Sequence, residues 1–441
     1  MIVSGGNYGW RYFEANNERR EVPDTISHDS FVFPVHAYDH TDGNVAVIGG
    51  RVYRGTAFPS LVGKYVYGDY LGQVWALTIE DGQVVANDRI ARFPKLTAFV
   101  ETDDGELLVL TYDFGFYKLS SDTAGESIPT RLSETGLFSD LASLTPAQGL
   151  IPYQPAHPFW SDGVVKQRWV GVPYNSNVEF TSDDWNFPLG TVAVKHFSYY
   201  QSQNNPGTER RLETRVILNS DQGWQGFTYR WNDEQTDAQL VTGRQTATLT
   251  VTQSDGSVVT QQYDFPSQGD CLRCHTEAEG WTLGLNTGQL NSEYDYGQAI
   301  NNQIETWNHI GMFDVDVGSV NQYDAYPSLN DEQVGLAQRA RTYLDVNCSV
   351  CHQPGGGTNV NLDFRAITAD EAINAIDVTP SAGDLGIENA LIIAPGSKES
   401  SILWQRISRL DDKRMPPLSS HVLDQQAIDI IGKWIDALPS E

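Results

Sequence analysis

The sequence predicts a multidomain protein in which two β-rich regions precede an α-helical C-terminal region. The length of 441 residues corresponds to about three domains at roughly 150 residues each. Aromatic residues make up 11% of the chain, which also holds 39 Gly and 20 Pro, a composition that favours short strands and turns. From Gln268 onward, apolar residues recur instead at helical spacing.

The charge balance limits the classes of partner. The chain has 29 basic and 57 acidic side chains, a net charge of −28, and a surface of this sign repels phosphate. We therefore expect neither nucleic acid nor anionic lipid as a partner. No run of about 18 apolar residues occurs, so no membrane span is predicted. Met1–Gly6 lacks the basic and apolar parts of a signal peptide, so we expect that a leader has been removed or that the sequence begins within a longer polypeptide.

Residues 1–125 are predicted to form short strands separated by Gly and Asp turns. Their spacing of about 8–12 residues is typical of a sandwich, barrel or propeller. The strand candidates are Ala46–Arg54, Lys64–Tyr67, Gln73–Ile79, Gln83–Ala91, Leu96–Glu101, Glu106–Tyr112 and Gly115–Leu119.

Three stretches of this segment carry a resemblance: GGNYGWRYFE (Gly5–Glu14), FPVHAYDH (Phe33–His40) and Ala46–Leu77. They resemble the closing blades of the six-bladed propellers of quinoprotein glucose/sorbosone dehydrogenases and their hedgehog-interacting-like relatives. The resemblance implies a partial β-propeller-like segment of about two blades. The family's quinone- and substrate-binding residues lie mostly in earlier blades, so we expect neither pyrroloquinoline quinone (PQQ) nor calcium on this chain.

Two blades leave a sheet edge with unpaired backbone groups. We expect missing propeller blades, the region around Leu137–Ile151 or self-association with a second copy to cover this edge, and the missing segment ranks first. The side chains expected to be buried on one face of the strands are Val47, Val52, Val66 and Val74.

A linker is predicted at Glu126–Ser133, followed by a β-sandwich of jelly-roll type at residues 134–266. Its strand candidates are Thr191–Tyr200, Arg211–Leu218, Gly226–Trp231, Thr246–Thr252 and Ser257–Phe265. A lone histidine in a strand is more often a structural residue than a ligand, so we interpret His157 and His196 as structural.

Residues 267–329 and 330–441 are predicted to form two further segments with helices and long loops. Asn330–Gln333 has the pattern of a capping box, and helical spacing follows it. A second apolar stripe before Pro439 predicts a terminal helix. Its members are Ala427, Ile431, Trp434, Ile435 and Leu438.

All four cysteines belong to two C-x-x-C-H motifs, Cys271–His275 and Cys348–His352. This spacing is the c-type haem attachment motif, because two cysteines about one helical turn apart reach both vinyl groups of one porphyrin. A thioredoxin-like motif would need a βαβ context, and a zinc site does not need His after each second Cys. The sequence therefore predicts two haem c groups. Their attachment and iron-ligand residues are Cys271, Cys274, His275, Cys348, Cys351 and His352.

Residues 330–438 resemble a class I cytochrome c domain, with a helix that leads into C-x-x-C-H, a loop that bears Met-Pro, and a C-terminal helix. The resemblance implies Met415, 63 residues after His352, as the sixth ligand of the second haem. For the first haem, Met312 and His309 are both candidates. A histidine from the β-rich region and an open site remain alternatives.

A wider similarity covers about 300 residues. The matching stretches are Trp160–Pro173, Cys271–Asn291, Cys348–Gly357 and Arg414–Leu418. They are similar to a family of bacterial dihaem c-type cytochromes, known mostly as conserved hypothetical proteins that occur fused to or encoded beside quinoprotein-like propellers. The resemblance implies electron transfer, with redox proteins or a quinoprotein dehydrogenase as partners.

The sequence thus predicts an exported dihaem cytochrome that transfers single electrons, more an electron carrier than an enzyme in its own right. Haem c is attached outside the cytoplasm in bacteria, so the predicted location is the periplasm or the cell exterior. One alternative is a dihaem peroxidase or oxidoreductase with an open haem site. Another is a haem-carrying module that binds a polymer or assembles with other subunits through Trp224, Tyr229 and Trp231, although core packing is the simpler role for these residues.

Overall fold

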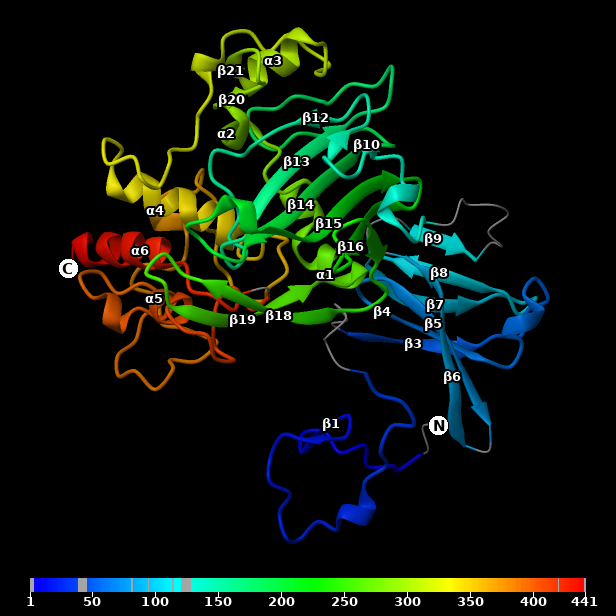
Figure 1. The fold of residues 1–441 in the computed structure, drawn as a ribbon. Helices are drawn as coiled ribbons and strands as arrows, with labels where there is room; N and C mark the ends of the chain where they lie inside the picture. Colours follow the sequence, from blue (N-terminus) through cyan, green and yellow to red (C-terminus); the bar gives the residue numbers. More distant parts are fainter. Residues whose placement is uncertain are drawn as a thin grey trace. The chain divides into compact units, whose positions relative to one another are not determined.

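A computed structural model describes residues 4–38, 46–80, 82–93, 95–112, 115–119, 128–418 and 420–439. The chain divides into two compact units, Met1–Ser127 and Ile128–Glu441 (Figure 1). This division falls within the predicted linker, of which Glu126 and Ser127 lie outside the described residues, as do Asp39 and His40 of the propeller-like stretches. Leu132, in the short 3₁₀ helix Leu132–Glu134, is already buried in the second unit.

The first unit contains two antiparallel sheets whose strands follow one another in sequence, and a short hairpin precedes them. All seven predicted strands are confirmed, with ends that shift by a few residues. The hairpin is β1 (Phe13–Glu14) and β2 (Asn17–Glu18). The sheets are β3 (Val47–Val52), β4 (Tyr65–Asp69), β5 (Gln73–Glu80) and β6 (Gln83–Arg92), and then β7 (Leu96–Glu101), β8 (Leu107–Thr111) and β9 (Gly115–Lys118).

The predicted inward face of these strands is confirmed at two valines and wrong at one. Val66 and Val74 are fully buried, but Val47 is 64% exposed; Val52 is half-buried. The pairing of β3 with β4 shifts register between Ile48 and Arg51. The inward-facing residues nevertheless alternate regularly along β3, at Ile48, Gly50 and Val52. Val47 is an odd number of residues from Val52 and therefore faces the other way, so Ile48 packs against the core in its place.

The second unit is built on one six-stranded antiparallel sheet. All five strands predicted for this region are present. The order of strands in the sheet is β12 (Ile151–Pro152), β13 (Val165–Gly171), β14 (Val192–Tyr200), β15 (Glu209–Ser220), β16 (Gly223–Trp231) and β17 (Ala238–Leu240). Three separate hairpins accompany it: β10 (Phe138–Asp140) with β11 (Thr145–Pro146), β18 (Gln245–Thr252) with β19 (Val258–Phe265), and β20 (Glu293–Asp295) with β21 (Ile300–Asn302). The jelly-roll expectation is wrong for the described residues, because neighbours in this sheet are consecutive, whereas a jelly roll requires Greek-key crossings.

Both faces of the six-stranded sheet are buried. Val194 and Val216 face a core that includes Leu132. The adjacent residues Ala193 and Ile217 face the opposite core, which includes Cys271, as expected from the two-residue period of a strand. The segment that follows β19 therefore covers one face, and the segment that precedes β12 covers the other.

The helices lie after β19 (Figure 1). They are α1 (Gln268–Cys274), α2 (Thr287–Leu290), α3 (Gln303–His309), α4 (Leu336–Leu344), α5 (Ile402–Ile407) and α6 (Gln425–Ala437). The predicted terminal helix is confirmed as α6, and its apolar stripe packs in one core with residues of α4, such as Tyr343. In the described part of the chain, no helix has the length and apolar character needed to cross a bilayer.

The predicted capping box at Asn330–Gln333 is wrong. Helix α4 begins after Gly335 and has no side-chain cap. Asp331 instead accepts a hydrogen bond from the backbone amide of Gln333 at 3.0 Å, which forms a local turn. Such a turn competes with helix initiation at Asp residues.

Helix α1 lies directly on strand β16, at Gly226. A Cβ atom at Gly226 would lie 2.5 Å from Cys271 Cβ and 2.9 Å from Cys271 Sγ. These separations are shorter than van der Waals contact, so only glycine permits this approach of helix to strand.

We expect Gly226→Val to destabilise the second unit by about 1–3 kcal/mol, because the added atoms displace α1 from the sheet. Thermal and urea unfolding of the full chain would measure the loss. Gly243→Val is the matched control, since a Cβ there meets no atom within 4 Å. Equal stability of the two variants would contradict the close approach.

Candidate functional site

The first C-x-x-C-H motif is held by the start of α1. Ser267 caps the helix: its Oγ accepts from the amide of Asp270 at 3.3 Å, and Asp270 accepts from the Ser267 amide at 3.0 Å. Arg244 Nε donates to the same carboxylate at 3.1 Å. Cys271 is buried and Cys274 ends the helix, so these contacts fix the orientation of both thiols.

His275 follows α1, and a hydrogen bond holds one nitrogen of its ring. Its Nδ1 lies 2.7 Å from the carbonyl oxygen of Trp281. Because a carbonyl only accepts, Nδ1 carries the proton and the lone pair of Nε2 is free. Burial, followed by the charge of Lys195, lowers the pKa of His275 to about 3, which keeps the ring neutral.

The second motif lies in the turn that continues α4. Cys348 is within the π-helical turn Asp345–Ser349, and the amide of His352 donates to the carbonyl of Cys348 at 2.9 Å. The His352 ring stands edge-on to Phe364, with centroids 5.8 Å apart. Within the described residues, the buried His352 Nδ1 has no hydrogen-bond partner.

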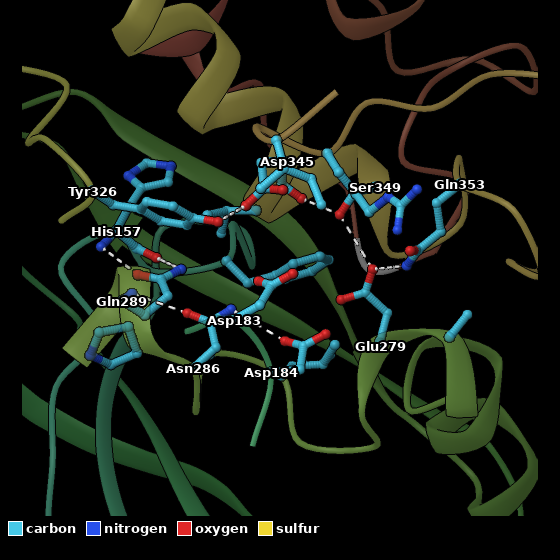
Figure 2. A pocket seen from close by; sticks show the side chains of 18 of the residues that line it. His157, Asp183, Asp184, Glu279, Asn286, Gln289, Tyr326, Asp345, Ser349 and Gln353 are labelled. Carbon is cyan, nitrogen blue, oxygen red and sulfur yellow. Dashed lines mark hydrogen bonds between the residues drawn. The ribbon is translucent and has the colours of Figure 1, made fainter. Parts of the chain in front are cut away.

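The structure brings the two motifs together. Glu279, four residues after His275, accepts a hydrogen bond from Ser349 Oγ at 3.2 Å and another from the side-chain amide of Gln353, and Figure 2 shows its carboxylate between these two side chains. A Cβ atom added at Gly355 would lie 3.6 Å from Ala278 Cβ, and one added at Gly357 would lie 3.6 Å from the carbonyl oxygen of Arg273. Both distances are ordinary van der Waals contacts. The loop after the second motif therefore packs on the segment around the first.

A cavity of about 80 Å³ is lined by Ser349 of the second motif and by Ala278 and Glu279, which follow the first motif (Figure 2). Arg168 and Lys195 from the sheet line it, together with four acidic residues of the surrounding loops: Asp183, Asp184, Glu279 and Asp345. Burial, followed by neighbouring carboxylates, raises the pKa of Asp184 to about 6 and that of Glu279 to about 8. These acids are partly protonated near neutral pH.

Sequence reasoning missed the position of His157 in this site. Its backbone exchanges two 2.9 Å hydrogen bonds with the Gln289 side chain, and its Nε2 lies 3.3 Å from Asn347 Nδ2. Burial lowers its pKa to about 4. Asn347 immediately precedes Cys348, so His157 is next to the second motif; no local pattern around His157 indicates this long-range contact.

His196 lies on the opposite face of the sheet. Its Nδ1 is 2.9 Å from Thr214 Oγ1, and its ring stands edge-on to Trp231. Tyr229 and Trp231 are buried in the same core, and Trp224 packs against the other one. These aromatic residues therefore have the core-packing role that the sequence favoured.

The candidate sixth ligands lie in different surroundings. Met312 is buried in the core that contains Cys271, whereas His309 is exposed at the end of α3. Met415 is half-buried, and its amide donates to the carbonyl of Arg406 at 2.9 Å. Ligation by each of the three stays a prediction. Among the described side chains, no group of three or more His, Cys, Asp or Glu is arranged to hold a metal ion.

Comparisons with known proteins give partial matches. HIPL2 protein of Arabidopsis thaliana is 35% identical over 86 residues, and HIPL1 protein of the same plant is 33% identical over 87 residues. Each match covers 17% of this chain and 12% of the relative, so the chain spans only a small part of the relatives' length. No family model matches the chain, and no solved structure gives a significant match.

We expect Glu279→Gln to flatten the pH dependence of stability. The folded-state pKa of Glu279, about 8, exceeds the unfolded value of about 4.3. The contribution of Glu279 to stability is therefore greatest at low pH and is lost as pH rises from about 4.3 toward 8. A Gln side chain at this position can still accept the hydrogen bonds from Ser349 and Gln353, and it does not ionise. Between pH 5 and 8, the wild type should lose on the order of 1–3 kcal/mol relative to the variant.

Urea unfolding at several pH values measures this difference. Glu332→Gln, an exposed position in the same unit, is the control and should follow the wild-type curve. If the free energies of unfolding of wild type and Glu279→Gln change with pH in parallel, the pKa of Glu279 is not raised in the folded state.

Proposed function

We propose that this chain is a dihaem c-type cytochrome that relays single electrons between redox partner proteins. The observation that carries the proposal is the contact between the segments that hold the two C-x-x-C-H motifs. Glu279, four residues after the first motif, accepts hydrogen bonds from Ser349 within the second motif and from Gln353 directly after it. Two cofactors attached there would be neighbours in one compact unit. An electron would then pass between them without an encounter between separate domains.

The donor set fits two covalent haems. In each motif the cysteines lie about one helical turn apart, and all four thiols are free. The Nε2 of His275 is available because Trp281 holds Nδ1, which is the usual outer contact of a ligating histidine. When bound, haem supplies a one-electron Fe(III)/Fe(II) couple whose potential depends on axial ligands and burial.

We propose Met415 as the sixth ligand toward the second motif and Met312 as the sixth ligand toward the first. Burial beside Cys271 supports Met312, while the exposure of His309 makes it the weaker candidate. The antiparallel sheets of the first unit suit a fragment of a propeller, with no PQQ or calcium of its own. A quinoprotein dehydrogenase is then a suitable electron donor, and the periplasm or cell exterior the location.

The cavity favours a second candidate function, a dihaem peroxidase. His157 and Glu279 line the cavity beside both motifs, where a proton acceptor and donor would be needed next to an open iron site. The two proposals differ in the number of Met–iron bonds. A near-infrared spectrum of the oxidised protein distinguishes them: the relay requires a Met–iron charge-transfer band for both haems, and the peroxidase requires a site without one.

We expect the double variant Cys348→Ala/Cys351→Ala to retain one haem, because the first motif is complete without the second. The pyridine haemochrome spectrum and the intact mass would count the haems. Cys271→Ala/Cys274→Ala is the matched variant and should also retain one. A wild type without haem, after expression with the haem-attachment machinery, would refute the proposed function.

We expect Met415→Ala to leave both haems attached and to lower the midpoint potential of one. A thioether ligand stabilises Fe(II) over Fe(III), so its loss removes part of the roughly 0.8 V range over which axial ligands tune haem. A redox titration measures both potentials. Met312→Ala is the companion variant and should lower the other potential. Unchanged potentials in Met415→Ala would reject Met415 as a ligand.

A further inference from the structure

A row of basic side chains crosses three strands of the sheet next to β16, the strand that carries α1. Arg168 of β13, Lys195 of β14 and Arg215 of β15 are direct neighbours across the strands. The next row on the same face contains Ile217 and Gly226, and Cys271 lies over Gly226. The basic row is therefore adjacent to the first C-x-x-C-H motif.

One member of this row is already neutralised. Arg215 forms a 2.5 Å ion pair with Glu213, which also accepts from the hydroxyl of Tyr263 at 2.5 Å. Its guanidinium lies 4.3 Å from the centroid of the Phe197 ring. Arg215 thus has a buried counter-charge and a structural role.

Arg168 and Lys195 are different. Within the described chain, neither forms an ion pair with a carboxylate. Arg168 is 7% exposed, and Lys195 Nζ donates only to a neutral acceptor, the carbonyl of Leu283, at 3.1 Å. A buried cation without a counter-charge is unfavourable, and burial, followed by the charges of Arg168 and Arg215, lowers the pKa of Lys195 to about 7. A bound anion would stabilise the charged forms of both side chains.

The acidic residues of the cavity do not supply this anion. Burial and other acidic groups raise the pKa values of Asp184 and Glu279. Close pairing with a cation would lower these values instead. Arg168 and Lys195 both line the cavity from the sheet. The third cation of the lining, Arg365, is already paired with Asp363 at 2.6 Å.

We infer that Arg168 and Lys195 bind the two propionate carboxylates of the haem attached to the first motif. This inference rests on the proposed function. A haem joined to the protein through its vinyl groups presents two carboxylates at another edge, and two unpaired cations match them in number and charge. Lys195 is bonded to the loop that follows His275, which keeps it close to that haem. The fork of Arg168 suits bidentate pairing with a carboxylate.

The test uses the full-length holoprotein and the variants Arg168→Gln and Lys195→Gln. Loss of a cation leaves negative charge beside the iron, which favours Fe(III). We expect two haems in each variant, with one midpoint potential lowered by about 59 mV or more, a tenfold change in the Fe(III)/Fe(II) equilibrium. The other potential should stay constant. Arg230→Gln is the control, because Arg230 lies on the same sheet but stacks on Phe265.

The outcomes separate the two proposals. A wild type that carries no haem overturns the proposed function and the inference with it. Two haems with unchanged potentials in both Gln variants overturn the propionate site alone. The propionate site is also overturned if acetate shifts a midpoint potential of the wild type, because Arg168 and Lys195 would then be accessible to free carboxylates rather than occupied by propionates.

A second measurement applies where the Gln variants fail to fold. Arg168→Lys keeps the charge but loses the bidentate fork. Resonance Raman spectra of wild type and Arg168→Lys should differ in the propionate bending modes of one haem. Identical modes would overturn the assignment.

Discussion

The close approach of α1 to strand β16 determines where the chemistry of this chain is located. Gly226 leaves room for Cys271 against the sheet, and the capping contacts of Ser267 and Asp270 fix the direction of the helix. His275 then emerges with its Nδ1 on Trp281. The next loop carries Glu279 to the second motif. A side chain at position 226 would disturb each of these relations, because all of them follow from the position of α1.

Buried charges of both signs lie near this helix. Arg168 and Lys195 of the sheet line the cavity together with Arg365 and four carboxylates of the segments that face the sheet. One cation, Arg215, is paired within the protein, whereas Arg168 and Lys195 are left for a ligand that brings its own negative charge. An overall charge of −28 makes this buried basic row unusual for the chain. It also suggests that the row serves a specific anion.

Local patterns in the sequence predicted elements better than arrangements. Alternation and turn residues identified strands β14, β15 and β16, and the apolar stripe identified α6. The jelly-roll order was wrong because strand order depends on pairings between distant segments. The burial of Val47 was wrong because Val47 and Val52 are an odd number of residues apart and face opposite sides of β3. The C-x-x-C-H motifs are visible in sequence because each is contiguous. Their contact through Glu279, and the alignment of Arg168 with Lys195, arise from tertiary packing that no local pattern encodes.

The central claim is that two haems lie close together on the second unit. Electron paramagnetic resonance of the fully oxidised protein tests it most directly, because two neighbouring Fe(III) centres broaden each other's signals by dipolar coupling. The account predicts broadened signals in the wild type, which sharpen in the single-haem variant Cys348→Ala/Cys351→Ala. Two sharp, independent signals in a wild type that carries both haems would contradict it.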